Sequence, residues 1–360
     1  MKRRPTVRLV LAPLLVIAVA VTAGWLVDER GAADPRPPLA SALDVLPSAT
    51  VVAGFTDWSA IRRDLGLGDA STAAARSRMG DDAALRDLST RSVLAESVEP
   101  MHASYGWSVA DLEWESYGQA AGGAAMVART SSRVSFADVE NRLRALGYTR
   151  DGAVWTLGDE GRVRVGPALA SALGTVALLP GRRLVVATSS AAYAPVVLAT
   201  IRGDEPSLLA RRPVADIAGQ LSGSASALVQ AQQEACRSTA VGEGDPDVAA
   251  QADAAVARTG GLAAPRYAGR GLVDGPRRQH IRFAWAYASP RVAADQLETR
   301  TSLATGPFIG RSGRVEDSLD LVSATVRGSA AALRFDLDPD RGAYMSGEGP
   351  LLFAACPASR

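Results

Sequence analysis

The sequence predicts an α+β protein in which an N-terminal transmembrane anchor precedes an extracytoplasmic region of mostly antiparallel sheets. Three observations carry this prediction: an apolar run near the N-terminus, short strands interleaved with capped helices, and a similar order of elements in both halves. We expect the helices to pack on one face of the sheets. Hydrophobic residues make up 47% and charged residues 21% of the 360 residues, which excludes wholesale disorder.

Residues 1–27 are predicted to be a transmembrane anchor or a signal peptide. The cations that precede the apolar run at residues 9–27 are Lys2, Arg3, Arg4 and Arg8. Because positive charges stay on the cytoplasmic side, the rest of the chain is expected outside the cytoplasm. A helix over this run would nearly span a hydrocarbon core of about 30 Å, which favours a single-pass protein of the cell membrane. The alternative is secretion after cleavage at Ala23, which together with Val21 supplies the small residues that signal peptidase requires.

A Pro-rich linker is expected over residues 28–44, because Pro35, Pro37 and Pro38 favour extended conformations. The first predicted α+β unit then spans residues 45–203. It opens with a strand at residues 49–55, after which Thr56 and Asp57 form the N-terminal cap of a helix.

The order strand–helix–strand–strand–helix is predicted in both halves. In the first unit, caps and apolar runs place these elements at residues 124–128, 136–146, 175–179, 184–187 and 191–201, with one more strand at residues 154–157. In the second unit, residues 204–360, they lie at residues 281–287, 290–303, 319–326 and 330–337, followed by a helix from Asp338-Pro339. Residues 260–276 between them are expected to form a Gly/Pro-rich loop. Since no clear residue identity links the halves, a duplication is inferred from the pattern alone.

The two cysteines, Cys236 and Cys356, are predicted to form one disulfide. An even count is the usual pattern in an exported domain, where the compartment is oxidising. Two buried free thiols are the alternative. Such a bond would tie the middle of the chain to an expected C-terminal strand at residues 351–355.

The charge balance and the scarcity of lysine exclude several classes of function. The net charge of +1 leaves no electrostatic footprint for nucleic acid. The only lysine is Lys2, at the N-terminus, which excludes a P-loop, a Schiff-base lysine and a Ser-Lys dyad. No cofactor is predicted.

No catalytic residue is assigned. The only candidate bases are His102 and His280, and no Gly-x-Ser-x-Gly motif is present, so ordinary histidines are the favoured reading. Glu113 and Glu115 flank Trp114 and are expected on one face of a strand. Neighbours on one strand rarely form a glycosidase pair without residues that shape the substrate.

No metal site or sugar platform is predicted either. Asp336, Asp338 and Asp340 alternate as calcium ligands can, but position six of the pattern is Arg341 where glycine is needed. A strand end, a helix cap and a first helical turn explain these acids. The aromatic residues expected to pack in the core are Tyr105, Trp107, Trp114 and Tyr117.

The chain resembles uncharacterised exported or single-pass membrane-anchored proteins of actinobacteria. The resemblance rests on the run at residues 9–27, the Pro-rich spacer, Leu46-Pro47-Ser48-Ala49-Thr50 and Phe55-Thr56-Asp57-Trp58. Arginine in place of lysine and abundant alanine suit a GC-rich genome. The resemblance implies a location in the cell envelope and transfers no functional residues.

These observations favour a non-catalytic cell-envelope protein that binds a partner protein, a lipid or a wall component. An exported hydrolase is the first alternative, and it requires His102 or His280 in a cleft beside a serine and a carboxylate. An accessory subunit of a membrane complex is the second alternative. An exposed apolar patch near the membrane-proximal face would favour that reading.

Overall fold

The computed structural model describes residues 36–237, 245–275, 278–310, 312–338, 345 and 351–357. The predicted anchor, residues 28–35 of the predicted linker and the helix expected after Asp338 lie outside the described residues. Within them, no helix combines the length and the apolar character that crossing a membrane requires.

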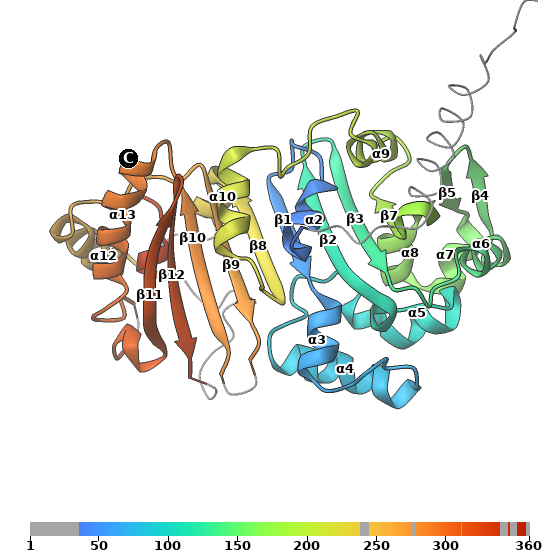
Figure 1. The fold of residues 1–360 in the computed structure, drawn as a ribbon, viewed down its shortest axis with the longest axis horizontal. Helices are drawn as coiled ribbons and strands as arrows, with labels where there is room; N and C mark the ends of the chain where they lie inside the picture. Colours follow the sequence, from blue (N-terminus) through green and yellow to red (C-terminus); the bar gives the residue numbers. More distant parts are fainter. Residues whose placement is uncertain are drawn as a thin grey trace, which may run out of the picture.

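One sheet of twelve antiparallel strands runs through the described part of the chain, so the antiparallel α+β prediction is confirmed (Figure 1). The strands, in their order across the sheet, are β11 (Leu319–Arg327), β12 (Ala330–Leu337), β10 (His280–Ala286), β9 (Tyr267–Val273), β8 (Ser226–Ala231), β1 (Val52–Thr56), β2 (Leu112–Ala120), β3 (Gly123–Thr130), β7 (Leu184–Thr188), β6 (Thr175–Leu179), β5 (Val154–Leu157) and β4 (Tyr148–Asp151). Sequence reasoning placed a loop where β9 lies and did not find β4.

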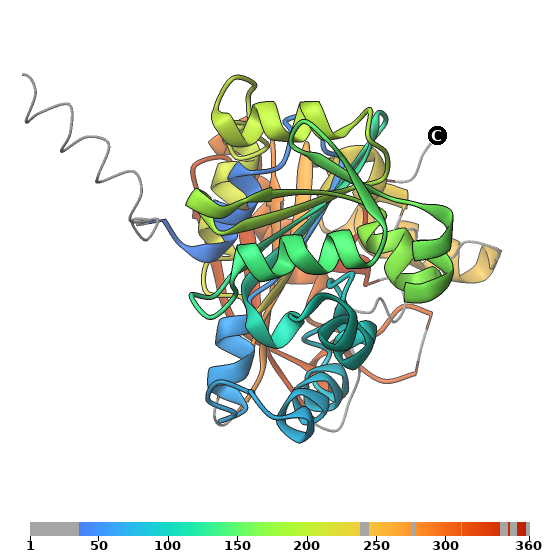
Figure 2. The same cartoon turned by 90° about the vertical axis from the view of Figure 1, so that its right-hand side faces the viewer.

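Helices cover both faces of the sheet, which corrects the expectation of one covered face (Figure 2). On one side, here called the α10 face, lie α2 (Pro38–Asp44), α9 (Ala194–Arg202) and α10 (Arg212–Gln220). On the other, here called the α13 face, lie α3 (Trp58–Asp64), α4 (Ala73–Leu85), α5 (Val98–Tyr105), α6 (Phe136–Ala145), α7 (Asp159–Val165), α8 (Pro167–Leu173), α12 (Pro246–Arg258) and α13 (Pro290–Leu303). A further short helix, α11 (Gln232–Arg237), follows β8. Strands buried on both sides need apolar residues at successive positions, and β7 has all five residues buried.

The two faces differ in the size of the side chains that the strands present. Phe283 and Trp285 of β10 join the core on the α13 face, whereas Ala284 between them joins the core on the α10 face. Small residues on the α10 face let α10 lie close to the sheet. At Gly269 of β9, for example, a Cβ atom would be only 2.9 Å from the Ile217 side chain of α10.

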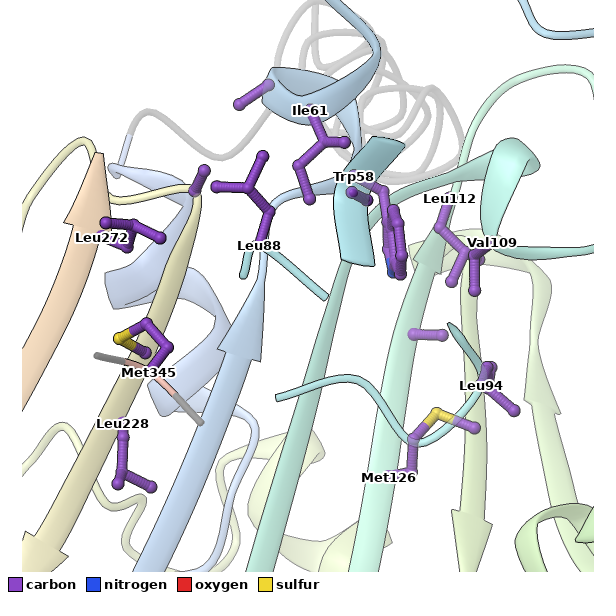
Figure 3. Packing of buried hydrophobic residues seen from close by; sticks show 14 of the residues in the cluster. Trp58, Ile61, Leu88, Leu94, Val109, Leu112, Met126, Leu228, Leu272 and Met345 are labelled. Atoms are coloured by element: carbon purple, nitrogen blue, oxygen red, sulfur yellow. The ribbon is translucent and has the colours of Figure 1, made fainter. Parts of the chain in front are cut away.

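The core on the α13 face is continuous across the middle of the sheet. Figure 3 shows Trp58 and Leu112 from the first half in the same cluster as Leu228 and Leu272 from the second half. Met345 is fully buried in this cluster. Apolar burial of this kind is the main favourable contribution to folding.

The order of elements repeats along the chain. A helix and a strand, α2–β1 and α10–β8, open the two halves, and β1 pairs with β8 antiparallel in the middle of the sheet. In each half, a strand that follows a helix pairs with the strand that precedes the same helix. β7 pairs with β3 across α6, and β12 pairs with β10 across α13. The boundary predicted between residues 203 and 204 falls between α9 and α10, and it stays a prediction.

The predicted linker at residues 28–44 is corrected at its C-terminal end. Helix α2 starts at Pro38, and Leu39 and Leu43 are buried against the sheet. Proline at the first position of a helix is well tolerated, because the N–H that it lacks would have no partner in the helix. The fold therefore includes residues that composition alone assigned to a spacer.

The predicted disulfide between Cys236 and Cys356 is confirmed, with Cα atoms 5.2 Å apart. The segment before Cys356 is a short 3-10 helix, Leu352–Ala354, where a strand was expected. The fully buried Arg300 of α13 donates to the carbonyl oxygens of Phe353 (2.6 Å) and Ala355 (3.0 Å). The disulfide and this guanidinium group together hold the C-terminal segment on the α13 face.

Candidate functional site

A polar cavity of about 300 Å³ opens on the α10 face of the second half, beside the C-terminal end of α10. We call it the arginine cavity. Its lining residues are Gly219, Gln220, Ser222, Arg282, Ser323, Thr325, Arg327, Ala332, Leu333 and Arg334.

Strand register explains why Arg282 and Arg334 meet there. Arg282 of β10 lies directly opposite Arg334 of β12, and Arg334 lies directly opposite Ser323 of β11. Next along the strands are Ala284 and Ala332, which belong to the core of the α10 face, so the arginines point to that face. Opposite positions on neighbouring strands lie about 5 Å apart at Cα, so like charges there repel.

Arg282 is the best anchored of the three. Its Nη1 donates to the carbonyl oxygen of Ser222 at 2.6 Å and lies 3.5 Å from that of Gln220, at the end of α10. Burial, followed by the charges of Arg334 and Arg327, lowers the pKa of Arg282. The environment therefore disfavours the positive charge, although arginine stays protonated at neutral pH.

Arg334 has an unpartnered donor: its Nε is buried and hydrogen bonds to nothing in the described part of the chain. A buried donor left unsatisfied costs about 1–3 kcal/mol. Across the described ranges, Arg282, Arg327 and Arg334 form no salt bridge with a carboxylate. An anion in the cavity would relieve both the repulsion and the missing hydrogen bond.

Gln220 is buried and lines the uncharged side of the cavity. Its Nε2 donates to the Ala330 carbonyl oxygen (3.3 Å), and its Oε1 accepts from the Thr325 hydroxyl (3.2 Å). Ser323, beside Arg334, makes no hydrogen bond to the described residues with its hydroxyl. That hydroxyl is therefore available to a ligand.

Carboxylates flank the cavity, but two of them are engaged elsewhere. At one end, Asp336 Oδ1 lies 2.6 Å from His280 Nδ1, and Arg278 is 4.0 Å from the other oxygen. Asp320 of β11 lies opposite Asp336. These groups form the row of the sheet next to Arg282 and Arg334 and do not neutralise them.

At the other end, Asp216 pairs with Arg212 at 2.9 Å and accepts hydrogen bonds from the Ser329 backbone and hydroxyl. Burial raises the pKa of Asp216, but the Ser329 hydrogen bonds and the Arg212 charge outweigh it and hold that pKa below its usual value. Asp216 is therefore an ionised group that holds the β11–β12 turn.

The structure places the two candidate histidines far from each other in the fold. His280 lies on β10 beside the Asp336 carboxylate, two residue pairs along the strands from Arg282 and Arg334 of the arginine cavity. His102 lies on α5, where its buried Nδ1 has no hydrogen-bond partner among the described residues. In the described part of the chain, no serine Oγ hydrogen bonds to either imidazole.

Glu113 and Glu115 do not share a face, which corrects the sequence-based expectation. A β-bulge between Leu112 and Trp114 changes the side to which Glu113 points. Glu113 pairs with Arg129 at 2.9 Å. Glu115 is buried on the α13 face and accepts hydrogen bonds from Ser92 Oγ (2.6 Å), Val93 N (2.6 Å) and Trp58 Nε1 (3.2 Å).

The Asp-x-Asp-x-Asp stretch is only partly visible, since Asp340 lies outside the described residues. Among the residues that are described, no three potential ligands from His, Cys, Asp and Glu are grouped as a metal site requires.

Three of the four aromatic residues expected in the core are found there, and Tyr117 is only partly buried. Tyr105, Trp107 and Trp114 are buried, and the hydroxyl groups of Tyr105 and Tyr148 are 2.9 Å apart. The exposed large apolar side chains of the described residues come from separate elements: Leu85, Val93, Val163, Val196 and Val322.

Sequence reasoning missed the arginine cavity. The signal that was present is the occurrence of Arg282 and Arg334 within alternating strands whose neighbouring positions, Ala284 and Ala332, are alanine. Arginine is rarely buried without a partner, so an arginine on the same strand face as core alanines indicates a binding site.

Comparisons with known proteins identify no family. No family model and no curated protein matches the chain. Two solved structures are similar over most of their length: crystal form I of TP0453 (9% identity, TM-score 0.38, 87% of this chain and 97% of that one) and crystal form III of TP0453 (8% identity, TM-score 0.37, 86% and 96%). These TM-scores are too low to establish a common fold.

Proposed function

We propose that this protein is a non-catalytic binding protein of the cell envelope, and that an anionic ligand binds in its arginine cavity. The observation that carries the proposal is the meeting of Arg282, Arg327 and Arg334 in one cavity without a carboxylate partner among the described residues. Such a site is unfavourable when empty and becomes favourable when an anion is bound. The ligand is an anionic group of a lipid, a wall component or a partner protein.

The location belongs to the same proposal. The apolar run at residues 9–27 anchors the chain in the membrane, and the remainder lies outside the cytoplasm, as in the actinobacterial proteins that the sequence resembles. The disulfide between Cys236 and Cys356 supports an oxidising compartment. A C-terminal alkaline phosphatase fusion should be active and a C-terminal GFP fusion dark, and the opposite pair of results would contradict the location. Gly24 as the mature N-terminus would show that the protein is secreted.

Binding is tested by thermal unfolding of the full chain in detergent at constant ionic strength. A panel of phosphate, sulfate, citrate and acetate is compared with chloride, because a ligand that binds only the native state raises the melting temperature. At least one oxyanion should stabilise the wild type and not the Arg282→Ala, Arg334→Ala double variant. Equal responses of both proteins to every anion would rule out the arginine cavity as the binding site.

The contact between His280 and Asp336 favours one alternative, an exported hydrolase in which Asp336 orients the imidazole beside a bound anion. Hydrolysis of a phosphate or carboxylate ester that disappears in His280→Ala, with the fold intact, would establish it. Ester binding without turnover supports the binding protein. The third possibility, an accessory subunit of a membrane complex, would be supported by co-purification of the arginine-cavity variants with the same membrane proteins as the wild type.

A further inference from the structure

We infer that the arginine cavity binds a phosphoryl group with two negative charges, either inorganic phosphate or the end of a phosphate monoester. This inference rests on the proposed function and specifies its ligand. It starts from the three arginines, because the charged side chains that line this cavity are all cationic. The second cavity, at the start of α6, is lined by Asp111 and Asp138 as well as Arg133 and Arg142.

The charge of the cavity favours a dianion over a carboxylate. One carboxylate would neutralise one guanidinium group and leave two close positive charges, Arg282 and Arg334 being directly opposite each other. A phosphate monoester has its second pKa near 6 and carries close to two charges at neutral pH. Of the acids at the two ends, Asp216 pairs with Arg212 at 2.9 Å, and Asp336 lies 2.6 Å from His280 Nδ1 and 4.0 Å from Arg278.

The directions of the donors favour a tetrahedral group. The guanidinium groups come from three neighbouring strands, and Ser323 lies on the opposite side of Arg334 from Arg282. The two oxygens of a carboxylate lie in one plane and match a single guanidinium fork. A phosphoryl group has three terminal oxygens that accept from different sides, so that Arg282, Arg334 and Ser323 can donate together.

The cavity has room for more than the phosphoryl group. Its volume of about 300 Å³ exceeds that of a phosphate ion, and Arg327 at its edge is exposed. The rest of a monoester can therefore leave towards solvent past Arg327. Both a phosphatidic acid headgroup and a soluble phosphate monoester fit this description, and the experiment separates them.

The test measures dissociation constants of the full chain in detergent for inorganic phosphate, sulfate, acetate and dihexanoyl phosphatidic acid below its critical micelle concentration. Phosphate should bind at least about tenfold more tightly than acetate. From about pH 8 to about pH 5 phosphate loses a charge and sulfate does not, so the affinity ratio of phosphate to sulfate should fall. The ratio is used because His280, Asp336 and Asp320 face the site from the next row and act on both anions.

Variants then place the binding in the cavity. Arg334→Ala should weaken phosphate binding about 10–100-fold, as expected for losing a charged hydrogen bond, and Arg334→Lys should weaken it less. Arg327→Ala, at an exposed position, provides a variant with little risk to folding and should also weaken binding. Arg291→Ala on α13 is the matched control, since it removes one exposed arginine from the other face and should leave binding unchanged.

The outcomes distinguish this inference from the proposed function. Acetate binding as tightly as phosphate, with the same dependence on Arg334, would overturn the phosphoryl assignment and leave an anion site. No oxyanion binding in the cavity would overturn both. Phosphatidic acid binding at least about tenfold more tightly than phosphate assigns the ligand to a lipid, and equal binding assigns it to a soluble phosphate or monoester.

Discussion

Arg282 and Arg334 lie directly opposite each other on β10 and β12, and both line a cavity that contains no carboxylate partner for them among the described residues. Like charges at this spacing destabilise a sheet. Pairs of like charges of this kind are expected at functional sites, where ligand binding offsets the loss of stability. The anion-binding proposal follows from this pair.

The first prediction concerns the stability of the protein without an anion. Replacing Arg334 by methionine removes the repulsion and the unpartnered Nε while keeping apolar volume, so the free energy of unfolding should rise by about 1 kcal/mol. Urea unfolding in chloride buffer measures it. Arg291→Met should change the free energy by less than about 0.5 kcal/mol. A destabilised Arg334→Met protein would show that the arginine is structural.

The second prediction concerns the disulfide. It closes a loop with a sequence separation of 120, for which the chain-entropy model gives about 4–5 kcal/mol. Cys356→Ser should lower the melting temperature and expose the C-terminal segment to proteases. Reduction with dithiothreitol should have the same effect, because it removes the same constraint. Two free sulfhydryl groups in the unreduced, denatured protein would contradict the bond.

The third prediction concerns the pH dependence of stability. Burial raises the pKa of Glu115 above its usual value of 4.5, despite hydrogen bonds from Ser92, Val93 and Trp58 that lower it. The folded state therefore binds a proton more tightly than the unfolded state does. The stability that this proton contributes is present below pH 4.5 and is lost as the pH rises through the folded pKa.

Glu115→Gln removes this titration and supplies the comparison. The difference in free energy of unfolding, wild type minus variant, should fall by up to about 1.4 kcal/mol per pH unit above the usual pKa of a glutamate. Chemical denaturation at a series of pH values measures it. Glu113→Gln is the matched control, since Glu113 is partly exposed and pairs with Arg129. A constant or rising difference would mean that Glu115 is ionised in the fold without penalty.

Much of the fold follows from local sequence signals. Ser135 and Ser289 accept hydrogen bonds at the starts of α6 and α13, where their caps predicted helices. The strand β9 was missed because Gly269 and Gly271 are typical of a loop, although the close approach of Ile217 to Gly269 and of Ser224 to Gly271 is what requires glycine there. The helix α2 was missed because Pro37 and Pro38 read as spacer.

The site could not be predicted from the sequence, because it depends on register between distant strands. Arg282 and Arg334 are each unremarkable alone, and only the antiparallel pairing of β10 with β12 brings them together. The same pairing brings His280 to Asp336, 56 residues apart in sequence. The opposite faces of Glu113 and Glu115 depend on a bulge that alternation cannot reveal.

The most direct test of the central claim is a crystal structure of the protein grown with selenate, whose selenium gives an anomalous signal. The anion-binding account predicts a peak in the arginine cavity, with selenate oxygens within hydrogen-bonding distance of Arg334 Nε and of Arg282. A cavity that holds only water at a selenate concentration that fills other sites would contradict it.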